Sequence, residues 1–418
     1  MEKFLLILLL IITGFQAYSA TDTSEGIFDQ RVRSLQVRNP DNFMAPPKIR
    51  LSTDDRLRIN FDIIGDQHEY LRYRLVHCNA DWTPSRLLES EYVDGFNEVE
   101  IDDYAYSSNT FVHYVNYNIE LPNPDLPFLT SGNYVLQVYP EGEPDDILLQ
   151  ARFSVTENTV GINGIVSSRT DKGFNTNYQQ LSLGVAAGEI KGVNPYQDLV
   201  VTVTMNNRPE TTRTVSHPLR IEGRNVIFDH DQNLIFDASN EYRRFETVRA
   251  DYPGMHVDSV RFEDNIWHAW LAIDEPRNDK DYTFDRTQKG RFMIDEYNAD
   301  DPDLGADYIM VHFSLDAPYT PGIDIYVDGD FNNHRFDKKN LMSFDHTSGL
   351  YTLDIPLKQG SYNYQYVVLP QGGGKADPGP VEGNKYETGN EYEVKVFLRL
   401  PGARADRLVG SGVFTAGQ

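Results

Sequence analysis

Apolar and polar residues alternate in this chain over many short stretches, which turn-forming residues separate. Three such stretches follow one another within residues 323–369. Their apolar or aromatic positions are Ile323, Ile325 and Val327; Tyr351, Leu353, Ile355 and Leu357; and Tyr362, Tyr364, Tyr366 and Val368. A period of two is what a half-buried strand requires. Asp328-Gly329 and Gln359-Gly360 supply turn chemistry between the stretches, so the segment predicts three strands of one β-sandwich.

The same alternation recurs along most of the chain. Further examples span residues 71–77, 111–119, 134–138, 199–205, 309–315 and 392–400. The 25 tyrosines and 22 phenylalanines suit pleated, half-buried surfaces. Helical patterns are weak, and the two best candidates, 84–92 and 240–249, are each shorter than about three turns. The pattern predicts an all-β protein made of tandem β-sandwich domains of Ig-like or early-set-like type.

Polar, turn-forming segments divide the chain. Residues 153–156 have the pattern of a last strand and lead into Glu157-Asn158-Thr159, and residues 298–305 are polar and contain proline. We therefore predict an N-terminal β-sandwich at 20–157, a middle β domain at 158–300 and a C-terminal early-set-like sandwich at 301–418. We expect residues 370–375 to form a flexible loop and the residues after Arg407 to be poorly ordered.

Residues 1–19 have the pattern of a secretory signal peptide. Lys3 precedes an apolar run from Phe4 to Ile12, and Ala17 and Ser19 place small residues before a cleavage site. The run is too short to span a bilayer stably, and no cysteine follows it that could carry a lipid anchor. We expect cleavage after Ser19 and an exported, soluble mature chain.

The charge balance narrows the choice of partners. The chain has 38 lysines and arginines against 63 aspartates and glutamates, a net charge of −25. Such an excess argues against binding to a nucleic-acid backbone and disfavours attraction to anionic lipid. Solubility is the simpler explanation of the acidity. The single cysteine, Cys78, rules out an intramolecular disulfide, and we expect its thiol to be buried near the end of a strand.

The chain shows no arrangement typical of a catalytic centre. Its ten histidines form no H-x-H or H-E-x-x-H zinc motif, and no G-x-S-x-G elbow or phosphate-binding loop is present. Paired carboxylates of the glycosidase type stay open, because the sequence does not give their separation. We predict that the protein is not an enzyme, with no catalytic, cofactor-binding or metal-binding residues and no cofactor.

Two segments have both a functional and a structural interpretation. Residues 328–333 (DGDFNN) offer closely spaced oxygen ligands for calcium, but they lack the register and the distal glutamate of a calcium loop, and a turn between strands explains them better. Trp267 and Trp270 face opposite sides of a strand, which places one of them at a surface or an interdomain contact. Core packing is the favoured interpretation of both tryptophans.

Beyond the signal peptide, the chain resembles the plug protein family of the type IX secretion system of Bacteroidota. The matching motifs are YRLVHCNADW at 73–82, EYVDGF at 91–96, YVNY at 114–117, LPN at 121–123, SGNY at 131–134, DASNEYRRF at 237–245, LKQGSYNY at 357–364 and EGNKYET at 382–388. The resemblance implies a non-enzymatic plug on the periplasmic face of the outer membrane. Such a plug closes the large protein-conducting barrel of the translocon when no substrate is crossing. The implied partner is that barrel, with no nucleic acid, no membrane insertion and no small-molecule substrate.

A second resemblance supports a competing hypothesis. Residues 323–369 are similar to a glycogen-binding-type module, in which V-x-G-x-F-N opens the unit and L-x-x-G-x-Y-x-Y-x-x-x-V closes it. The alternative is therefore a periplasmic or surface carbohydrate-binding protein. In such modules a tryptophan follows the F-N pair, whereas Asn333 and His334 follow it here and no tryptophan occurs after Trp270. This departure argues against sugar binding by the unit.

Overall fold

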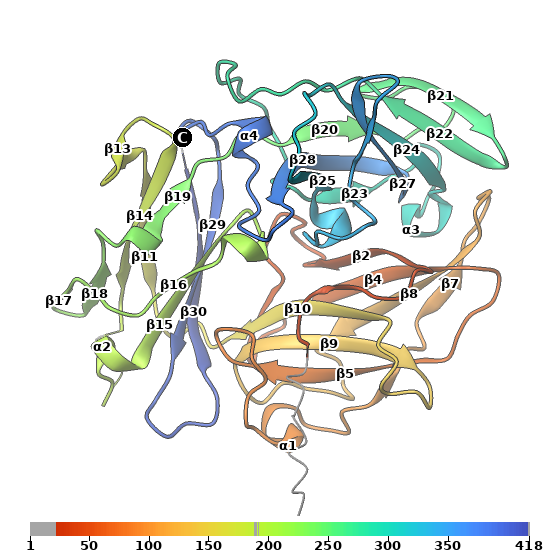
Figure 1. Ribbon diagram of the computed structural model, residues 1–418. Helices are drawn as coiled ribbons and strands as arrows, with labels where there is room; N and C mark the ends of the chain where they lie inside the picture. The colour runs from red at the N-terminus through yellow and green to blue at the C-terminus, as the bar shows by residue number, and fades with distance from the viewer. Residues whose placement is uncertain (1–21, 188–189, 191, 417–418) are drawn as a thin grey trace, which may run out of the picture.

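The computed structural model describes residues 22–187, 190 and 192–416, so the predicted signal peptide at 1–19 lies outside the described residues. These residues form three large hydrophobic cores, which define three lobes (Figure 1). The first lobe draws its core from residues 32–155, the second from 160–236 and 392–416, and the third from 245–381. Strands dominate every lobe, which confirms the all-β prediction.

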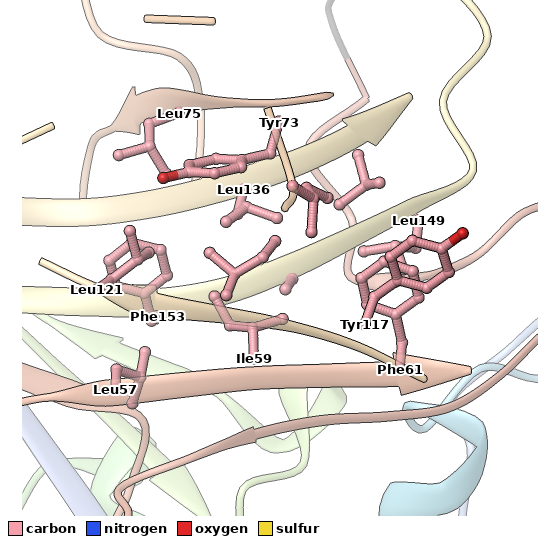
Figure 2. Close-up of a cluster of buried hydrophobic side chains, with 14 of the residues drawn as sticks. Leu57, Ile59, Phe61, Tyr73, Leu75, Tyr117, Leu121, Leu136, Leu149 and Phe153 are labelled. Atoms are coloured by element: carbon pink, nitrogen blue, oxygen red, sulfur yellow. The ribbon is translucent and has the colours of Figure 1, made fainter. Parts of the chain in front are cut away.

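The first lobe is a sandwich of two sheets. One sheet has the order β1 (Gly26–Ile27), β10 (Leu149–Thr156), β9 (Gly132–Pro140), β5 (Leu71–Cys78) and β6 (Val99–Glu100), with β3 (Lys48–Arg50) parallel to β10. The other has the order β2 (Val32–Arg38), β4 (Leu57–Ile64), β8 (Tyr114–Leu121) and β7 (Tyr104–Tyr106). The strands alternate apolar side chains inward, and Figure 2 shows Tyr73 and Leu75 pointing toward the β4 side chains Leu57, Ile59 and Phe61. These residues are almost fully buried, which makes the sandwich a close-packed unit.

The second lobe combines two distant parts of the chain. Its first sheet has the order β11 (Ile162–Ser167), β14 (Tyr178–Val185), β18 (Asn225–Phe228) and β17 (Arg220–Glu222), with β19 (Ile235–Asp237) beside β14. Its second sheet has the order β16 (Arg213–Val215), β15 (Leu199–Met205), β29 (Glu391–Leu398) and β30 (Arg407–Thr415). A short ribbon joins β12 (Arg169–Thr170) to β13 (Gly173–Phe174). In Figure 1 the dark-blue β29 and β30 therefore lie beside green strands.

The third lobe holds the three strands predicted within residues 323–369. One sheet contains β20 (Arg243–Glu246), β28 (Gly360–Pro370), β23 (Phe292–Ile294) and β25 (Ile323–Asp328). The other has the order β21 (Val257–Glu263), β22 (Ile266–Leu271), β24 (Tyr308–Leu315), β27 (Leu350–Lys358) and β26 (Ser343–Asp345). The tight turn from β27 to β28 needs glycine, because a Cβ on Gly360 would lie 2.1 Å from the Met293 carbonyl oxygen. The prediction of β25, β27 and β28 is confirmed.

Helices are short in the described residues. They are α1 (Glu89–Tyr92), α2 (Pro195–Asp198), α3 (Pro302–Gly305) and α4 (Gly379–Glu382), with single 3₁₀ turns at Pro209–Thr211, Gln232–Leu234 and Asp330–Asn332. Of the weak helical candidate at 84–92 only the last turn, α1, is present, and the candidate at 240–249 contains β20, which pairs with β28. Among the described residues, no helix has the length and apolar character needed to cross a membrane.

The boundary predicted at 300–301 does not separate two lobes. Strands on both sides of residue 300 pair in one sheet, as β22 and β24 do, so a boundary at 300–301 would run through the third core. The chain then returns to the second lobe, where β29 pairs with β15 over Leu199↔Leu398 to Met205↔Tyr392. The segments that lead into and out of the third lobe touch, because Asn390 Nδ2 donates to the Ala238 carbonyl at 2.6 Å. The third lobe is thus inserted between β19 and β29 of the second.

The end of the chain also differs from expectation. The residues after Arg407, predicted to be poorly ordered, form β30, which pairs antiparallel with β29 along nearly its whole length. Leu408 and Val409 on this strand are buried. Composition near a terminus suggested disorder, but Val409 is buried in the second core and Leu408 in a small cluster that includes Ala80 of the first lobe, and this burial holds the segment in place.

Candidate interaction surface

The first and third lobes meet over a buried ion pair. Lys358, at the end of β27, places its Nζ 2.7 Å from Oδ2 of Asp62 on β4. The Tyr308 hydroxyl donates to the same oxygen at 2.6 Å and lies 2.8 Å from Ser34 Oγ. Burial raises the pKa of Asp62 despite the attraction of Lys358. Because desolvation offsets the attraction, the contact fixes the position of the lobes more than it adds stability.

Partly buried contacts surround this pair. Arg38 and Arg58 of the first lobe each place a guanidinium nitrogen 3.1 Å from Oδ2 of Asp303. The buried Tyr114 hydroxyl donates to the Ala306 carbonyl at 2.8 Å. Two charge-assisted contacts and a buried hydrogen bond thus continue the interface beyond its centre.

The second lobe joins the first through the β29–β30 hairpin. Arg407 Nη2 lies 2.7 Å from Oε2 of Glu157, and Oδ2 of Asp406 accepts from the Ala80 backbone N–H at 3.0 Å. A small buried apolar cluster sits beside these contacts: Ala80, Val200, Phe397 and Leu408. Two of its members lie on the hairpin, so the hairpin belongs to the second core and to the contact with the first lobe.

Charged side chains also connect the second and third lobes. Arg291 Nη2 lies 2.8 Å from Oε1 of Glu391, and both side chains are largely buried. Arg208 is fully buried, with Nη2 2.6 Å from Oε1 of Glu210 and Nε 3.8 Å from Oδ2 of Asp328. Each pair of lobes is therefore joined by polar groups that would be costly to separate in a dry environment. This arrangement favours one stiff body over three mobile domains.

The turn at residues 328–333 is closed by an internal cation. Nδ1 of His334 lies 2.9 Å from Oδ1 of Asp328, and its Nε2 lies 2.6 Å from Oδ1 of Asp330. The two carboxylates hold the pKa of buried His334 well above its usual value, and the imidazolium helps to lower the pKa of Asp328 to about 2 although burial acts against it. The carboxylates that resembled calcium ligands thus face a protonated histidine. His334 follows the F-N pair by two residues and is buried, so this position offers no exposed aromatic ring on which a sugar could stack.

The other residues considered from the sequence take structural positions. Cys78 is buried, as predicted, and burial raises the pKa of its thiol to about 12. Trp267 packs against the core of the third lobe. Trp270 lies on the opposite face of β22, where its ring stacks 4.5 Å from that of His312.

Sequence reasoning missed a polar row on the outer face of the third lobe. Nδ1 of His268 lies 2.9 Å from Nε2 of His312, whose Nδ1 lies 2.7 Å from Oδ1 of Asp354. Arg261 covers the Trp270 ring at 5.0 Å. The row crosses β21, β22, β24 and β27, and only the order of these strands brings its members together. No spacing in the sequence could have signalled it.

Aromatic side chains gather in solvent along one edge of the molecule, which we call the aromatic edge: Tyr70, Tyr104, Tyr106, Phe111 and Phe262. The three tyrosines surround His68, and the Tyr106 hydroxyl lies 3.0 Å from its Nδ1. The Phe111 ring lies 4.5 Å from that of Phe262 in the third lobe. The Phe111 side of this edge is held in place, since the Phe111 N–H donates to Asp307 at 2.8 Å. Exposed, fixed aromatic side chains are typical of protein-binding surfaces.

Comparison with known proteins shows which family the chain is similar to. The family model described as "Type 9 secretion system plug protein 1st domain" matches residues 32–157, which coincide with the first lobe. A crystal structure of a hypothetical protein from Parabacteroides merdae is 38% identical in sequence, covers 94% of this chain and 99% of its own, and superposes with a TM-score of 0.92. The chain belongs to the type 9 secretion system plug protein family. No curated protein matches it.

Membership of the plug family confirms the resemblance seen in the sequence and associates the chain with this secretion system. The similarity to the Parabacteroides protein extends over all three lobes, whereas the family model describes the first lobe alone. At 94% coverage of this chain, the solved relative extends well beyond the first lobe.

Proposed function

We propose that this protein is the non-enzymatic plug of the type IX secretion translocon. In this role it closes the periplasmic end of the large outer-membrane barrel when no substrate is being exported. The family match over residues 32–157 is the observation that carries the proposal. The joined lobes support it, because a stopper must keep its shape against a moving barrel.

The proposal places the mature chain in the periplasm, against the inner face of the outer membrane. It includes removal of residues 1–19 as a signal peptide. The net charge of −25 favours a protein partner over an anionic lipid surface.

We further propose that the aromatic edge contributes to the contact with the barrel. Its side chains come from the first and third lobes, so a partner bound there would hold two lobes at once. A standard protein interface buries roughly 1,200–2,000 Å² in total, which a broad edge can supply and a small pocket cannot.

Affinity purification from the native cell envelope tests the partner. The tagged wild-type chain should recover a very large outer-membrane barrel. Replacing Tyr106 and Phe111 by aspartate should lower the yield of barrel at least about tenfold, because the variant places charge where aromatic contacts are needed. Recovery of only soluble proteins or polysaccharide would refute the proposal.

The matched control replaces two exposed aromatics elsewhere, Phe174 and Tyr252, by aspartate. This double variant carries the same added charge and should recover the barrel as the wild type does. Equal losses from both double variants would remove the aromatic edge from the proposal.

A further inference from the structure

A cleft of about 430 Å³ opens between the first and third lobes. One wall is the start of β2, and the other is formed by the Asp330–Asn332 turn, the loop that follows it and β27. Its volume lies in the range of sites that hold ligands. Neither the family assignment nor the proposed plug function uses this cleft.

The floor of the cleft is apolar. Phe331, Leu353 and Ile355 line it from the third lobe, and Val32 lines it from the first. The three side chains from the third lobe are only partly buried. A ligand that brought apolar groups into the cleft would remove this surface from water.

Four cations stand around this floor: Arg33, Arg335, Lys338 and Lys339. In the described part of the chain, none of them forms an ion pair with a carboxylate. Arg33 donates only to the Gln30 and Val32 carbonyls, and its burial lowers its pKa. Among the described residues most of the other lysines and arginines are paired, so four unpaired cations around one cleft form a local concentration of positive charge.

The cleft also contains two carboxylates that are already engaged. Asp354 accepts from His312 at 2.7 Å, and Asp337 accepts from the Lys339 backbone N–H at 2.8 Å. Within the described part of the chain, neither carboxylate lies at ion-pair distance from a cation of the rim. The rim therefore presents a net positive charge to any ligand.

One wall of the cleft has a free strand edge. Among the described residues β2 is the last strand of its sheet and pairs only with β4, but at the cleft its Val32 N–H donates to the Asp29 carbonyl and its Val32 carbonyl accepts from Arg33. β26 covers β27 only at residues 350–352, so within the described chain Leu353–Leu357 has β24 on one side and no strand on the other. Such edges offer backbone donors and acceptors to an added extended segment, although Pro356 supplies no N–H.

We propose that the cleft binds an extended peptide segment of a partner protein in which apolar side chains alternate with carboxylates. Alternate residues of an extended chain point to opposite sides, so the apolar ones face Phe331, Leu353 and Ile355. The carboxylates between them face the rim and pair with Lys338 and Lys339. The free edge of β27 holds the backbone.

Fluorescence anisotropy with a defined probe tests this site. The probe is a fluorescein-labelled nonapeptide of alternating valine and glutamate, added to the purified mature chain at low salt. Two control peptides are measured beside it. One carries lysine in place of glutamate, and the other carries serine in place of valine. Saturable binding of the first peptide, and at least about tenfold weaker binding of the other two, is expected from the apolar floor and the cationic rim.

Charge reversal at exposed positions locates the site without touching a core. The double variant Lys338→Glu, Lys339→Glu should bind the glutamate peptide at least about tenfold more weakly and the lysine peptide more tightly than the wild type does. Arg86→Glu with Arg286→Glu changes the net charge by the same amount at exposed sites away from the cleft, and it should leave both affinities within about twofold. A benzophenone at the central position of the peptide should cross-link to Phe331, Leu353 or Ile355.

Several results would overturn the proposal. These are no saturable binding to the wild type, equal weakening by the two double variants, or equal binding of the glutamate and lysine peptides. Phosphatidylglycerol vesicles form a further arm. If they bind through Lys338 and Lys339 while the peptide does not, the cleft is a lipid contact and the peptide proposal fails. None of these outcomes depends on recovery of the barrel, so the plug proposal stands or falls separately.

Discussion

At the scale of single residues, His334 shows how a buried cation can replace a bound metal. It lies between Asp328 and Asp330 in a turn whose oxygen-rich sequence resembles a calcium loop. The side chain is almost completely buried, and its pKa is well above the usual value because two carboxylates surround it. The turn thus receives from within the chain the positive charge that a calcium loop takes from solution.

Replacing His334 tests this arrangement through pH. Since its folded pKa is raised, the stabilisation is complete below the unfolded pKa of about 6.5 and is lost as the pH rises through the folded pKa. The free energy of unfolding of the wild type should exceed that of His334→Gln by a constant amount below about pH 6.5. Above it the difference should shrink by about 1.4 kcal/mol per pH unit.

Urea unfolding of both proteins between pH 5 and 9 measures this difference. His217→Gln is the matched control, because His217 is exposed and, among the described residues, its side chain hydrogen-bonds only to its neighbour Ser216. Its difference from the wild type should stay near zero. A His334→Gln difference that is flat from pH 5 to 9 would show that the fold does not raise the pKa of this histidine.

Single residues also show what could be predicted from the sequence and what could not. Cys78 was correctly predicted to be buried, because an unpaired cysteine beside a strand pattern packs like a small apolar side chain. The contact between His268 and His312 could not be predicted. These residues lie 44 positions apart and meet only because β22 pairs in parallel with β24.

At the scale of elements, β4 and β27 meet through one buried pair from different sheets and different lobes. Lys358→Met should lower the free energy of unfolding by about 3–5 kcal/mol, because the Asp62 carboxylate would be left buried without its cation. Adding Asp62→Asn should restore most of the loss, since the uncompensated charge is then gone while Tyr308 keeps an acceptor.

Chemical denaturation of the single and double variants measures both effects. Lys339→Met is the control lysine, exposed and unpaired, and should change the free energy of unfolding by less than about 0.5 kcal/mol. If the double variant is no more stable than Lys358→Met, the cost does not arise from an isolated Asp62 charge.

The strands themselves were easier to predict from the sequence than the strands with which they pair. Alternation in residues 323–369 predicted β25, β27 and β28 correctly, since burial of one face imposes a period of two. The same alternation at 392–400 predicted a strand but not that β15, almost two hundred residues earlier, would be its neighbour. Pairing between distant strands depends on the whole fold, so the insertion of the third lobe could not be deduced from local pattern.

At the scale of the whole molecule, buried contacts join three lobes into one body. Asp62 and Lys358 join the first to the third, Arg291 and Glu391 join the third to the second, and the β29–β30 hairpin joins the second to the first. A body in which each pair of lobes is joined has the rigidity that a plug of a protein-conducting channel needs. The central claim is that this body closes a barrel.

Outer-membrane permeability tests that claim most directly. Deleting the gene should admit hydrophilic solutes too large for ordinary porins, and the full-length chain supplied in trans should restore the barrier. Deleting the barrel as well should abolish the leak, because the solutes would have no open channel. An intact barrier in the single deletion, or a leak that persists without the barrel, would contradict the account.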